Sequence, residues 1–280
     1  MSKFHLVHCV PNPRIHGLYG YMEVIQTIDW GLKELGHDVT YGLNQSSTSS
    51  INIIFGAQVL PIEILSQFPQ DTIVYNLEQL KGIKKEQLKE GLHFSAKNFK
   101  IWEYSLLNSS VWSALNVNTQ SYIPIGYTPI LTRIPKFKEQ DIDVLIYGMP
   151  GQDRLNVFWK LAEAGLKILF VCGMYGQERD DLIARSKIVL NVNLYNQSKI
   201  FEIVRVSYLL ANKKAVVAIV DDVSSIESDI SSLVKLSTMD SVVDDCIQLL
   251  ADDRQREKME SDGFEIFRKR DIRDILSKVL

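Results

Sequence analysis

Short, continuously apolar runs recur along the chain, and most are bounded by glycine, proline or polar residues. Runs of this length, rich in valine and isoleucine, are typical of strands buried on both faces of a parallel sheet. Segments with apolar residues at helical spacing stand between many of them, and this alternation predicts an α/β fold. The predicted strands cover residues 4–10, 38–42, 51–55, 72–76, 121–125, 141–147, 166–172, 187–193 and 214–219.

The segments between the strands have helical patterns of different quality. Residues 21–35 place apolar side chains on one face, and Gly36 follows as a helix C-cap. The other predicted helices are 81–90, which is strongly charged, 99–115, which is rich in aromatic residues, and 155–164, 198–212, 241–251 and 254–279.

The strand–helix alternation occurs in two sets, separated by residues 128–140. This stretch holds Pro129 and Pro135, mixes both charges and lacks periodicity, as linkers do. We therefore predict two domains, residues 1–130 and residues 131–280, each with its own parallel sheet.

Composition narrows the classes of function. Of the 280 residues, 46% are hydrophobic and 23% are charged, which is usual for a globular protein. The net charge of −3 argues against nucleic acid as a partner, and no apolar run is long enough to span a membrane. The chain has three cysteines, Cys9, Cys172 and Cys246. Their odd number and wide spacing argue against a disulfide framework and against a zinc site. With no signal-peptide pattern, we expect a cytoplasmic protein, and peripheral membrane contact stays open.

Two buried-strand patterns enclose the segment 198–212. This segment is apolar on most sides, but Glu202 and Arg205 stand three residues apart and therefore on one helix face. Ser198 and Lys199 lie at its start, and a helix N-terminus that follows a parallel strand suits an anion. We therefore predict an anion-binding helix; the alternative is a Glu–Arg pair on a solvated stripe.

A second anion site is predicted after the strand at 141–147. The next loop contains Gly148 and Gly151, and Arg154 comes just inside the following helix. Free backbone N–H groups together with a guanidinium suit a diphosphate. A plain turn followed by a solvated arginine is the alternative. Arg179, which comes after the next strand, is interpreted as a surface helix residue.

Polar loops also follow the strands of the first half. His16, Gly17 and Gly20 come after the first strand, and Asn76 and Glu78 come after a later one. Since loops at the carboxyl ends of parallel strands line the ligand crevice, Glu78 is a candidate general base. The alternative is a glutamate that stabilises the start of the next helix. The glycines lack Gly-x-Gly-x-x-Gly spacing, so a dinucleotide fingerprint is absent.

The stretch 186–219 is similar to the donor-binding region of GT-B glycosyltransferases, in particular the bacterial "glycosyltransferase 1-like" group. The opening of the chain, a strand, a glycine-containing loop, a helix and Gly-His-Asp-Val before a second strand, resembles their N-terminal domains. The resemblance implies two Rossmann-like domains whose parallel sheets face each other across a cleft, with an acceptor-side N-terminal domain and a C-terminal domain that binds the nucleotide sugar. The matching residues are Leu190, Asn191, Glu202, Ala211, Asn212, Val216 and Val217.

The resemblance also implies roles for the candidate residues. Basic side chains and helix N-termini would neutralise the diphosphate without a metal or other cofactor, and polar side chains would hold the sugar hydroxyls. The implied donor-binding set is Gly148, Gly151, Arg154, Tyr175, Asn193, Ser198, Lys199, Glu202 and Arg205. The implied catalytic set is Glu78, His16 and Glu202, with Gly17, Gly20 and Asn76 on the acceptor-side loops.

Two patterns depart from related enzymes. Retaining members often have Glu-x7-Glu, whose second glutamate holds the donor ribose, and Tyr208 stands at that place here. The ribose contact and the stereochemical outcome therefore stay open. The Asp-x-Asp pattern of metal-using glycosyltransferases occurs by letter at 141–143, but it begins a strand, at the end away from the expected crevice.

The sequence thus predicts a metal-independent glycosyltransferase of the hexosyltransferase class. It would move a sugar from a nucleotide sugar to the hydroxyl of a glycan or other acceptor, in polysaccharide biosynthesis. A sugar-nucleotide epimerase is one alternative, but it would need a histidine near the sugar, and the second half contains none. A non-catalytic nucleotide-sugar binder is the other alternative, and the missing second glutamate fits it.

Overall fold

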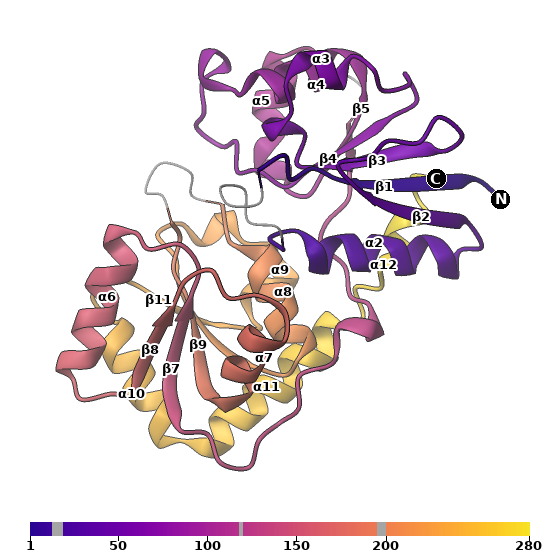
Figure 1. The fold of residues 1–280 in the computed structure, drawn as a ribbon. Coiled ribbons are helices and arrows are strands. Elements are labelled where there is room, and N and C mark those ends of the chain that lie inside the picture. Colours follow the sequence, from indigo (N-terminus) through magenta and orange to yellow (C-terminus); the bar gives the residue numbers. More distant parts are fainter. Residues whose placement is uncertain (13–18, 118–119, 195–199) are drawn as a thin grey trace. The chain divides into compact units, whose positions relative to one another are not determined.

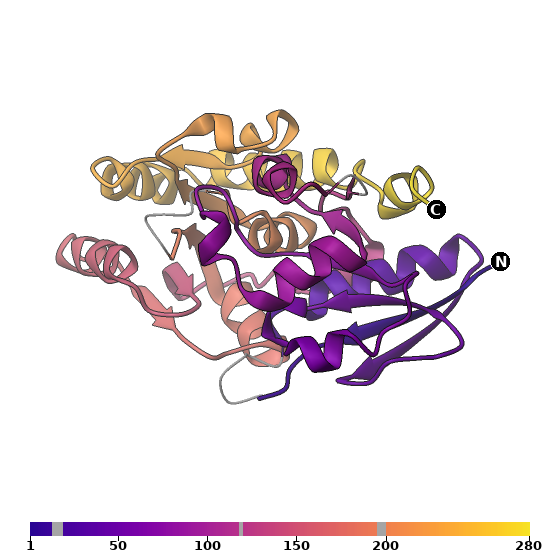
Figure 2. The same cartoon turned by 90° about the horizontal axis from the view of Figure 1, so that it is seen from above.

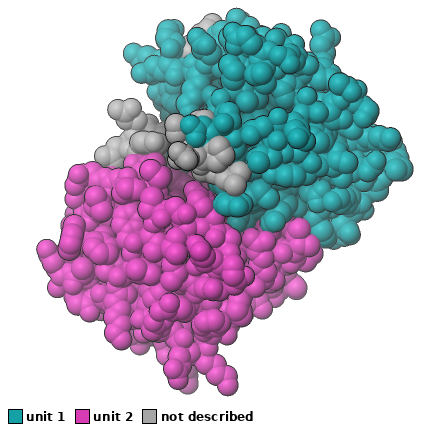
Figure 3. Space-filling view, viewed as in Figure 1, with its two compact units in different colours: residues 1–126, 271–280 teal, residues 127–270 magenta. Residues whose placement is uncertain are grey.

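The computed structural model describes residues 1–12, 19–117, 120–194 and 200–280. The chain forms two compact units, which Figures 1 and 3 show as ribbon and as surface. Unit 1 holds Met1–Gly126 and Asp271–Leu280, and unit 2 holds Tyr127–Arg270. In each unit the described strands pair in parallel and helices cover the sheet, so the predicted α/β fold class is confirmed.

Unit 1 contains a six-stranded sheet in the order β2-β1-β3-β4-β5-β6. Its strands are β1 (Lys3–His8), β2 (Asp38–Leu43), β3 (Ile51–Phe55), β4 (Ile73–Asn76), β5 (Lys100–Glu103) and β6 (Gln120–Tyr122). One face carries α3 (Ile62–Leu65), α4 (Glu90–Asn98) and α5 (Ser109–Ala114), which close an apolar core with the strands. The other face carries α2 (Met22–Glu34) and α12 (Ile272–Leu276), as Figures 1 and 2 show.

Helix α12 packs directly against α2, although the two helices stand at opposite ends of the chain. Gly31 permits the contact, because a Cβ atom there would come within 2.9 Å of side-chain atoms of both Ile272 and Leu276. The predicted single helix 254–279 is therefore wrong. The chain instead forms α11 (Asp253–Phe267) in unit 2 and then α12, which Asp271 caps by accepting from the N–H of Arg273.

Two other helix predictions for unit 1 are wrong. The stretch 99–115 contains the strand β5 before the short helix α5, and the stretch 81–90 contains only a 3-10 turn, Lys85–Gln87. A strand of four residues is too short to reveal its period, and aromatic residues suit a buried strand as well as a helix.

Unit 2 contains a five-stranded sheet in the order β11-β10-β9-β7-β8. Its strands are β7 (Ile142–Tyr147), β8 (Ile168–Val171), β9 (Ser186–Asn191), β10 (Ala215–Ile219) and β11 (Lys235–Ser237). One face is closed by α6 (Gln152–Glu163) and α10 (Val242–Ala251), whose apolar side chains join one core cluster. The other face carries α7 (Gly176–Arg185), α8 (Ile203–Ala211) and α11, and α9 (Ser228–Ser231) precedes β11 (Figure 1).

Helix α8 is shorter than the predicted helix 198–212. Ile200 and Phe201 bury their side chains ahead of it, and Glu202 is its N-cap residue. The prediction of an anion site at this helix start also named Ser198 and Lys199, which lie outside the described residues.

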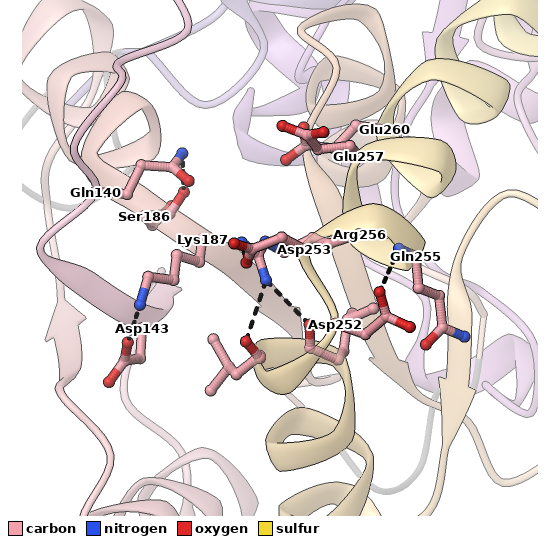
Figure 4. Close-up of polar contacts among 12 residues, drawn as sticks. Gln140, Asp143, Ser186, Lys187, Asp252, Asp253, Gln255, Arg256, Glu257 and Glu260 are labelled. Atoms are coloured by element: carbon pink, nitrogen blue, oxygen red, sulfur yellow. Dashed lines mark hydrogen bonds and ion pairs between the residues drawn. The ribbon is translucent and has the colours of Figure 1, made fainter.

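The two aspartates of the Asp-x-Asp pattern at 141–143 form ion pairs at the amino edge of this sheet. The Nζ of Lys187 lies 2.9 Å from Asp143 Oδ1, and Gln140 donates to the main-chain oxygen of Ser186 (Figure 4). Arg185 Nε donates to Asp141 Oδ1 at 2.9 Å. Both aspartates therefore pair with basic side chains, and the pair of Asp143 with Lys187 connects β7 to β9.

Candidate functional site

The strand order of unit 2 creates a reversal at β7. From β7 the chain passes to β8 on one side, and it then returns to β9 on the other side. In parallel α/β sheets the loops that leave two such strands diverge at the carboxyl edge, and ligands bind there. The side chains that gather beyond β7 and β9 are therefore the first candidates for a binding site.

Arg205 lies in the first turn of α8 and reaches the ends of both strands. Its Nη1 donates to Asn191 Oδ1 at 2.9 Å, and its guanidinium lies 5.3 Å from the ring centroid of Tyr147. The side chain keeps 14% of its surface exposed. These two contacts orient the guanidinium of a side chain that is not fully buried.

Arg154 is a second cation at the same edge. It is only 2% exposed, so the alternative of a solvated arginine is wrong. Its Nε donates to Val192 O at 2.9 Å and its Nη1 to Met149 O at 2.7 Å. Burial, and then the charge of Arg205, lower the pKa of Arg154 to about 10, so it stays charged at neutral pH.

Gly148 allows both guanidiniums to approach the chain. Its φ is +124°, and a Cβ atom there would come 2.9 Å from Arg154 Nη1 and 3.2 Å from Arg205 Nη2. A larger residue would therefore be strained in its backbone and would also push the two arginines away.

Glu202 is the counter-charge of both arginines. Its Oε1 lies 4.0 Å from Arg154 Nη2, and its Oε2 lies 3.6 Å from Arg205 Nη2. With 21% of its side chain exposed, it is partly buried. These three side chains carry two positive charges and one negative charge, at distances longer than a good ion pair. A diphosphate that reached Arg205 could form shorter, charge-assisted hydrogen bonds with it, and the buried Arg154 would add positive charge beside them.

Arginine and tyrosine side chains alternate from Arg205 to Arg133 inside unit 2. Arg179 lies 5.9 Å from the ring centroid of Tyr147 and 4.6 Å from that of Tyr208. Arg133 lies 5.3 Å from the Tyr208 ring. The interpretation of Arg179 as a surface residue is wrong, because it is only 6% exposed. Aromatic faces replace water around its charge and hold it in place.

Tyr208, at the place of the second glutamate of Glu-x7-Glu, is committed to the interior of unit 2. Its hydroxyl donates to Asp180 Oδ2 at 2.7 Å and accepts from Arg133 Nε at 2.9 Å. Asp180 also forms an ion pair with Arg179 at 2.8 Å. Burial and the Asp180 carboxylate raise the pKa of Tyr208, so the hydroxyl stays protonated. We therefore interpret Tyr208 as a structural residue, whose hydroxyl connects Asp180 to Arg133.

The other predicted donor residues are spread around the same edge. Gly151 is the N-cap residue of α6, and Tyr175 is the N-cap residue of α7. Asn193 lines a small cavity of about 40 Å³ with Val192 and the loop after β10. Val192, which lines this cavity, also accepts a hydrogen bond from Arg154.

Unit 1 has a reversal of its own at β1, which pairs with β2 on one side and β3 on the other. Near this edge the side chain of Glu78 is held in one orientation. Tyr21 Oη donates to its Oε1 at 2.8 Å, and Gln58 Nε2 donates to the same oxygen at 2.7 Å. The alternative of a glutamate that stabilises the next helix is wrong, because α4 begins only at Glu90.

The sequence analysis did not identify Tyr21 and Gln58 as partners of Glu78, nor His8, whose ring centroid lies 6.4 Å from that of Tyr21. Burial and the Glu78 carboxylate raise the pKa of Tyr21. His8 is buried at the end of β1, with Nδ1 3.2 Å from Tyr41 Oη, and burial lowers its pKa. Their positions after a strand or at a helix start were visible in the sequence. Which loops meet was not visible, because it depends on the strand order.

The remaining acceptor-side predictions fall at different places. Asn76 ends β4 and is buried, whereas Gly20 lies in an exposed turn before α2. His16 and Gly17 lie outside the described residues.

No three histidine, cysteine, aspartate or glutamate side chains in the described part of the chain come together as metal ligands do. No helix in it is both long and apolar enough to cross a bilayer.

Similar solved structures are glycosyltransferases. The structure of Anabaena Alr3699/HepE in complex with UDP and glucose has a TM-score of 0.65 at 10% sequence identity, and the match covers 100% of this chain and 98% of that chain. AviGT4, a glycosyltransferase involved in avilamycin A biosynthesis, has a TM-score of 0.60 at 14% identity, with 99% and 96% covered. T4 phage BGT in complex with its UDP-glucose substrate has a TM-score of 0.59 at 13% identity, with 99% of each chain covered.

Comparison of the sequence with family models and with curated proteins found no match. The assignment of the fold to a known type therefore rests on the structural similarity, which covers both units. It is the GT-B glycosyltransferase fold that the sequence resemblance predicted.

Proposed function

We propose that this protein is a glycosyltransferase that moves a sugar from a nucleoside-diphosphate sugar to an acceptor hydroxyl, in glycan or polysaccharide synthesis. The observation that carries the proposal is the pair Arg154 and Arg205 at the strand reversal of a GT-B fold. Two oriented guanidiniums suit a diphosphate better than a neutral ligand.

In the proposed reaction, the bond between the sugar C1 and the diphosphate oxygen breaks, and the acceptor oxygen forms the new bond to C1. Arg205 and Arg154 take up the negative charge that develops on the leaving diphosphate. Glu202 and Asn193 accept hydrogen bonds from sugar hydroxyls. Glu78 takes the proton from the acceptor hydroxyl.

The two units divide these roles in the proposal. The predicted domain of residues 131–280 holds the donor, and the predicted domain of residues 1–130 supplies the acceptor loops and the base. We expect the reaction in the cytoplasm, where nucleotide sugars are the available donors.

Donor binding has a direct thermodynamic test. Uridine nucleotides are the first choice, because HepE and T4 phage BGT were crystallised with UDP or UDP-glucose. UDP at about a hundred times its dissociation constant is expected to stabilise the folded chain by about 2.7 kcal/mol. Thermal unfolding with UDP, GDP, CDP and uridine, compared at equal concentration, measures the effect. A melting temperature unchanged by every nucleoside diphosphate would contradict a donor site.

Turnover distinguishes the enzyme from a protein that only binds. Slow hydrolysis of the matched nucleotide sugar, followed as released nucleoside diphosphate, is expected from the full chain. Nucleotide binding without any release, in the presence of varied hydroxyl acceptors, would favour the non-catalytic binder.

We also propose that the reaction needs no metal, because the arginine pair supplies the positive charge. Treatment with EDTA is therefore expected to leave donor hydrolysis or transfer within about twofold of the untreated rate. Activity that EDTA abolishes and Mn²⁺ restores would contradict this. The assay uses the parent protein with EDTA and with EDTA plus excess Mn²⁺, so that inhibition by the chelator itself is recognised.

A further inference from the structure

A buried carboxylate that the sequence analysis did not single out lies at the end of β5. Glu103 is 2% exposed, and each of its oxygens accepts two hydrogen bonds. Oε1 accepts from the main-chain N–H of Ser105 and from Asn108 Nδ2, both at 2.9 Å. Oε2 accepts from Asn76 Nδ2 at 2.8 Å and from Trp112 Nε1 at 2.6 Å. Four donors and no acceptor are the surroundings of an ionised carboxylate.

The two asparagines connect this carboxylate to the main chain of Glu78. Asn76 Nδ2 also donates to Glu78 O at 3.1 Å, and Asn76 Oδ1 accepts from Glu78 N at 3.2 Å. Asn108 Nδ2 also donates to Glu78 O at 2.9 Å, and Asn108 Oδ1 accepts from Leu80 N at 2.8 Å. Both hydrogens of each Nδ2 group are therefore used.

We infer that Glu103 is a positioning residue, whose carboxylate fixes the amide orientation of Asn76 and Asn108 and thereby the backbone that presents Glu78. A carboxylate only accepts hydrogen bonds, so each asparagine must turn its NH2 group toward Glu103. Each amide oxygen then faces the loop, where a backbone N–H needs it. The inference rests on the proposed function, in which Glu78 is the base.

Glutamine cannot replace Glu103, although it has nearly the same shape. One carboxylate oxygen faces the main-chain N–H of Ser105 and the other faces Trp112 Nε1, and neither group can accept. Whichever way a glutamine amide is turned, its NH2 group meets a donor. Burial raises the pKa of Glu103 and the hydrogen bonds, that of Trp112 first, lower it, so that the pKa is about 7.

The test is Glu103→Gln, followed by hydrogen exchange at the Glu78 and Leu80 amides. Both amides are expected to exchange at least about tenfold faster than in the parent, because the asparagines lose their imposed orientation. The kcat for transfer is expected to fall by at least about tenfold, while UDP affinity stays within about twofold. A folded Glu103→Gln protein with parental exchange at both amides would overturn the inference.

A double variant keeps the test decisive if Glu103→Gln does not fold. In Glu103→Gln/Trp112→Phe the indole N–H that donates to Oε2 of Glu103 is removed. The NH2 group of the introduced glutamine can then take the place of Oε2, where it faces Asn76. Asn76 must then turn its oxygen toward residue 103 and release Glu78 N, while Asn108 keeps its contacts. We expect faster exchange at Glu78 and parental exchange at Leu80; parental exchange at both would overturn the inference.

Two comparisons separate positioning from general destabilisation. Trp112→Phe alone leaves the carboxylate in place and is expected to keep both amides protected. Glu260→Gln removes another buried glutamate, which pairs with Lys136 in unit 2, and is expected to change neither amide. If Glu78→Gln turns over normally, the base assignment fails, whereas the exchange experiment still decides the role of Glu103.

Discussion

Glu78→Gln is expected to lower kcat by about a hundredfold or more while donor affinity changes less than about twofold, since general base catalysis contributes about 10²–10⁴ to rates. A base acts mainly in the transition state, so its loss affects turnover and spares binding. The glutamine oxygen can still accept from Tyr21 and Gln58, and we therefore expect the fold to persist. Turnover under saturating donor and UDP affinity by calorimetry measure the two effects separately.

A matched control for this variant is Glu63→Gln, an exposed glutamate in the first turn of α3 in the same unit. It is expected to leave turnover and UDP affinity at parental values. If Glu78→Gln transfers sugar as fast as the parent, the carboxylate serves only to hold Tyr21 and Gln58 in place.

Arg205→Ala is expected to weaken UDP binding by about tenfold to a hundredfold. Charge-assisted hydrogen bonds contribute about 1.5–3 kcal/mol, and each 1.4 kcal/mol is about a factor of ten in affinity. The variant also removes the contacts to Asn191 and Tyr147, so its melting temperature must be measured together with its affinity. Arg205→Lys keeps the charge without the planar fork, and we expect an intermediate affinity.

The control is Arg185→Ala, which removes an exposed arginine from the amino edge of the same sheet. Arg185 pairs with Asp141, and exposed pairs of this kind contribute little. UDP affinity is expected to stay parental in this variant. A folded Arg205→Ala protein that binds UDP as tightly as Arg185→Ala does would contradict a donor site at the carboxyl ends of β7 and β9.

The sequence was sufficient for the strands that hold the site. The apolar runs at 141–147, 187–193 and 214–219 correspond to β7, β9 and β10, because buried parallel strands need continuous apolar side chains. It also singled out Gly148, Arg154 and Arg205, which the structure brings together. It failed at β5, where a short strand within an aromatic stretch has no period of its own, and Glu103 was missed for that reason.

Local pattern could not reveal which charges are buried. Arg154 and Arg179 follow loops as surface arginines do, and their helices are amphipathic in the ordinary way. The structure buries them because the carbonyl of Val192 and the ring of Tyr208, both distant in sequence, replace water around the guanidiniums. Such partners become neighbours only after the sheet has formed.

By itself, the sequence determined the α/β class, all the strands except β5 and β11, and the polar loops after them, since these follow from local periodicity and turn chemistry. Only the tertiary structure decided the strand order, with β9 beside β7 in unit 2 and β3 beside β1 in unit 1. That order unites Arg154 with Arg205, and long-range packing within unit 1 brings Tyr21 and Gln58 to Glu78. The physical reason is that strand order depends on how whole sheets bury apolar surface against their helices, a long-range property that no local stretch of sequence contains.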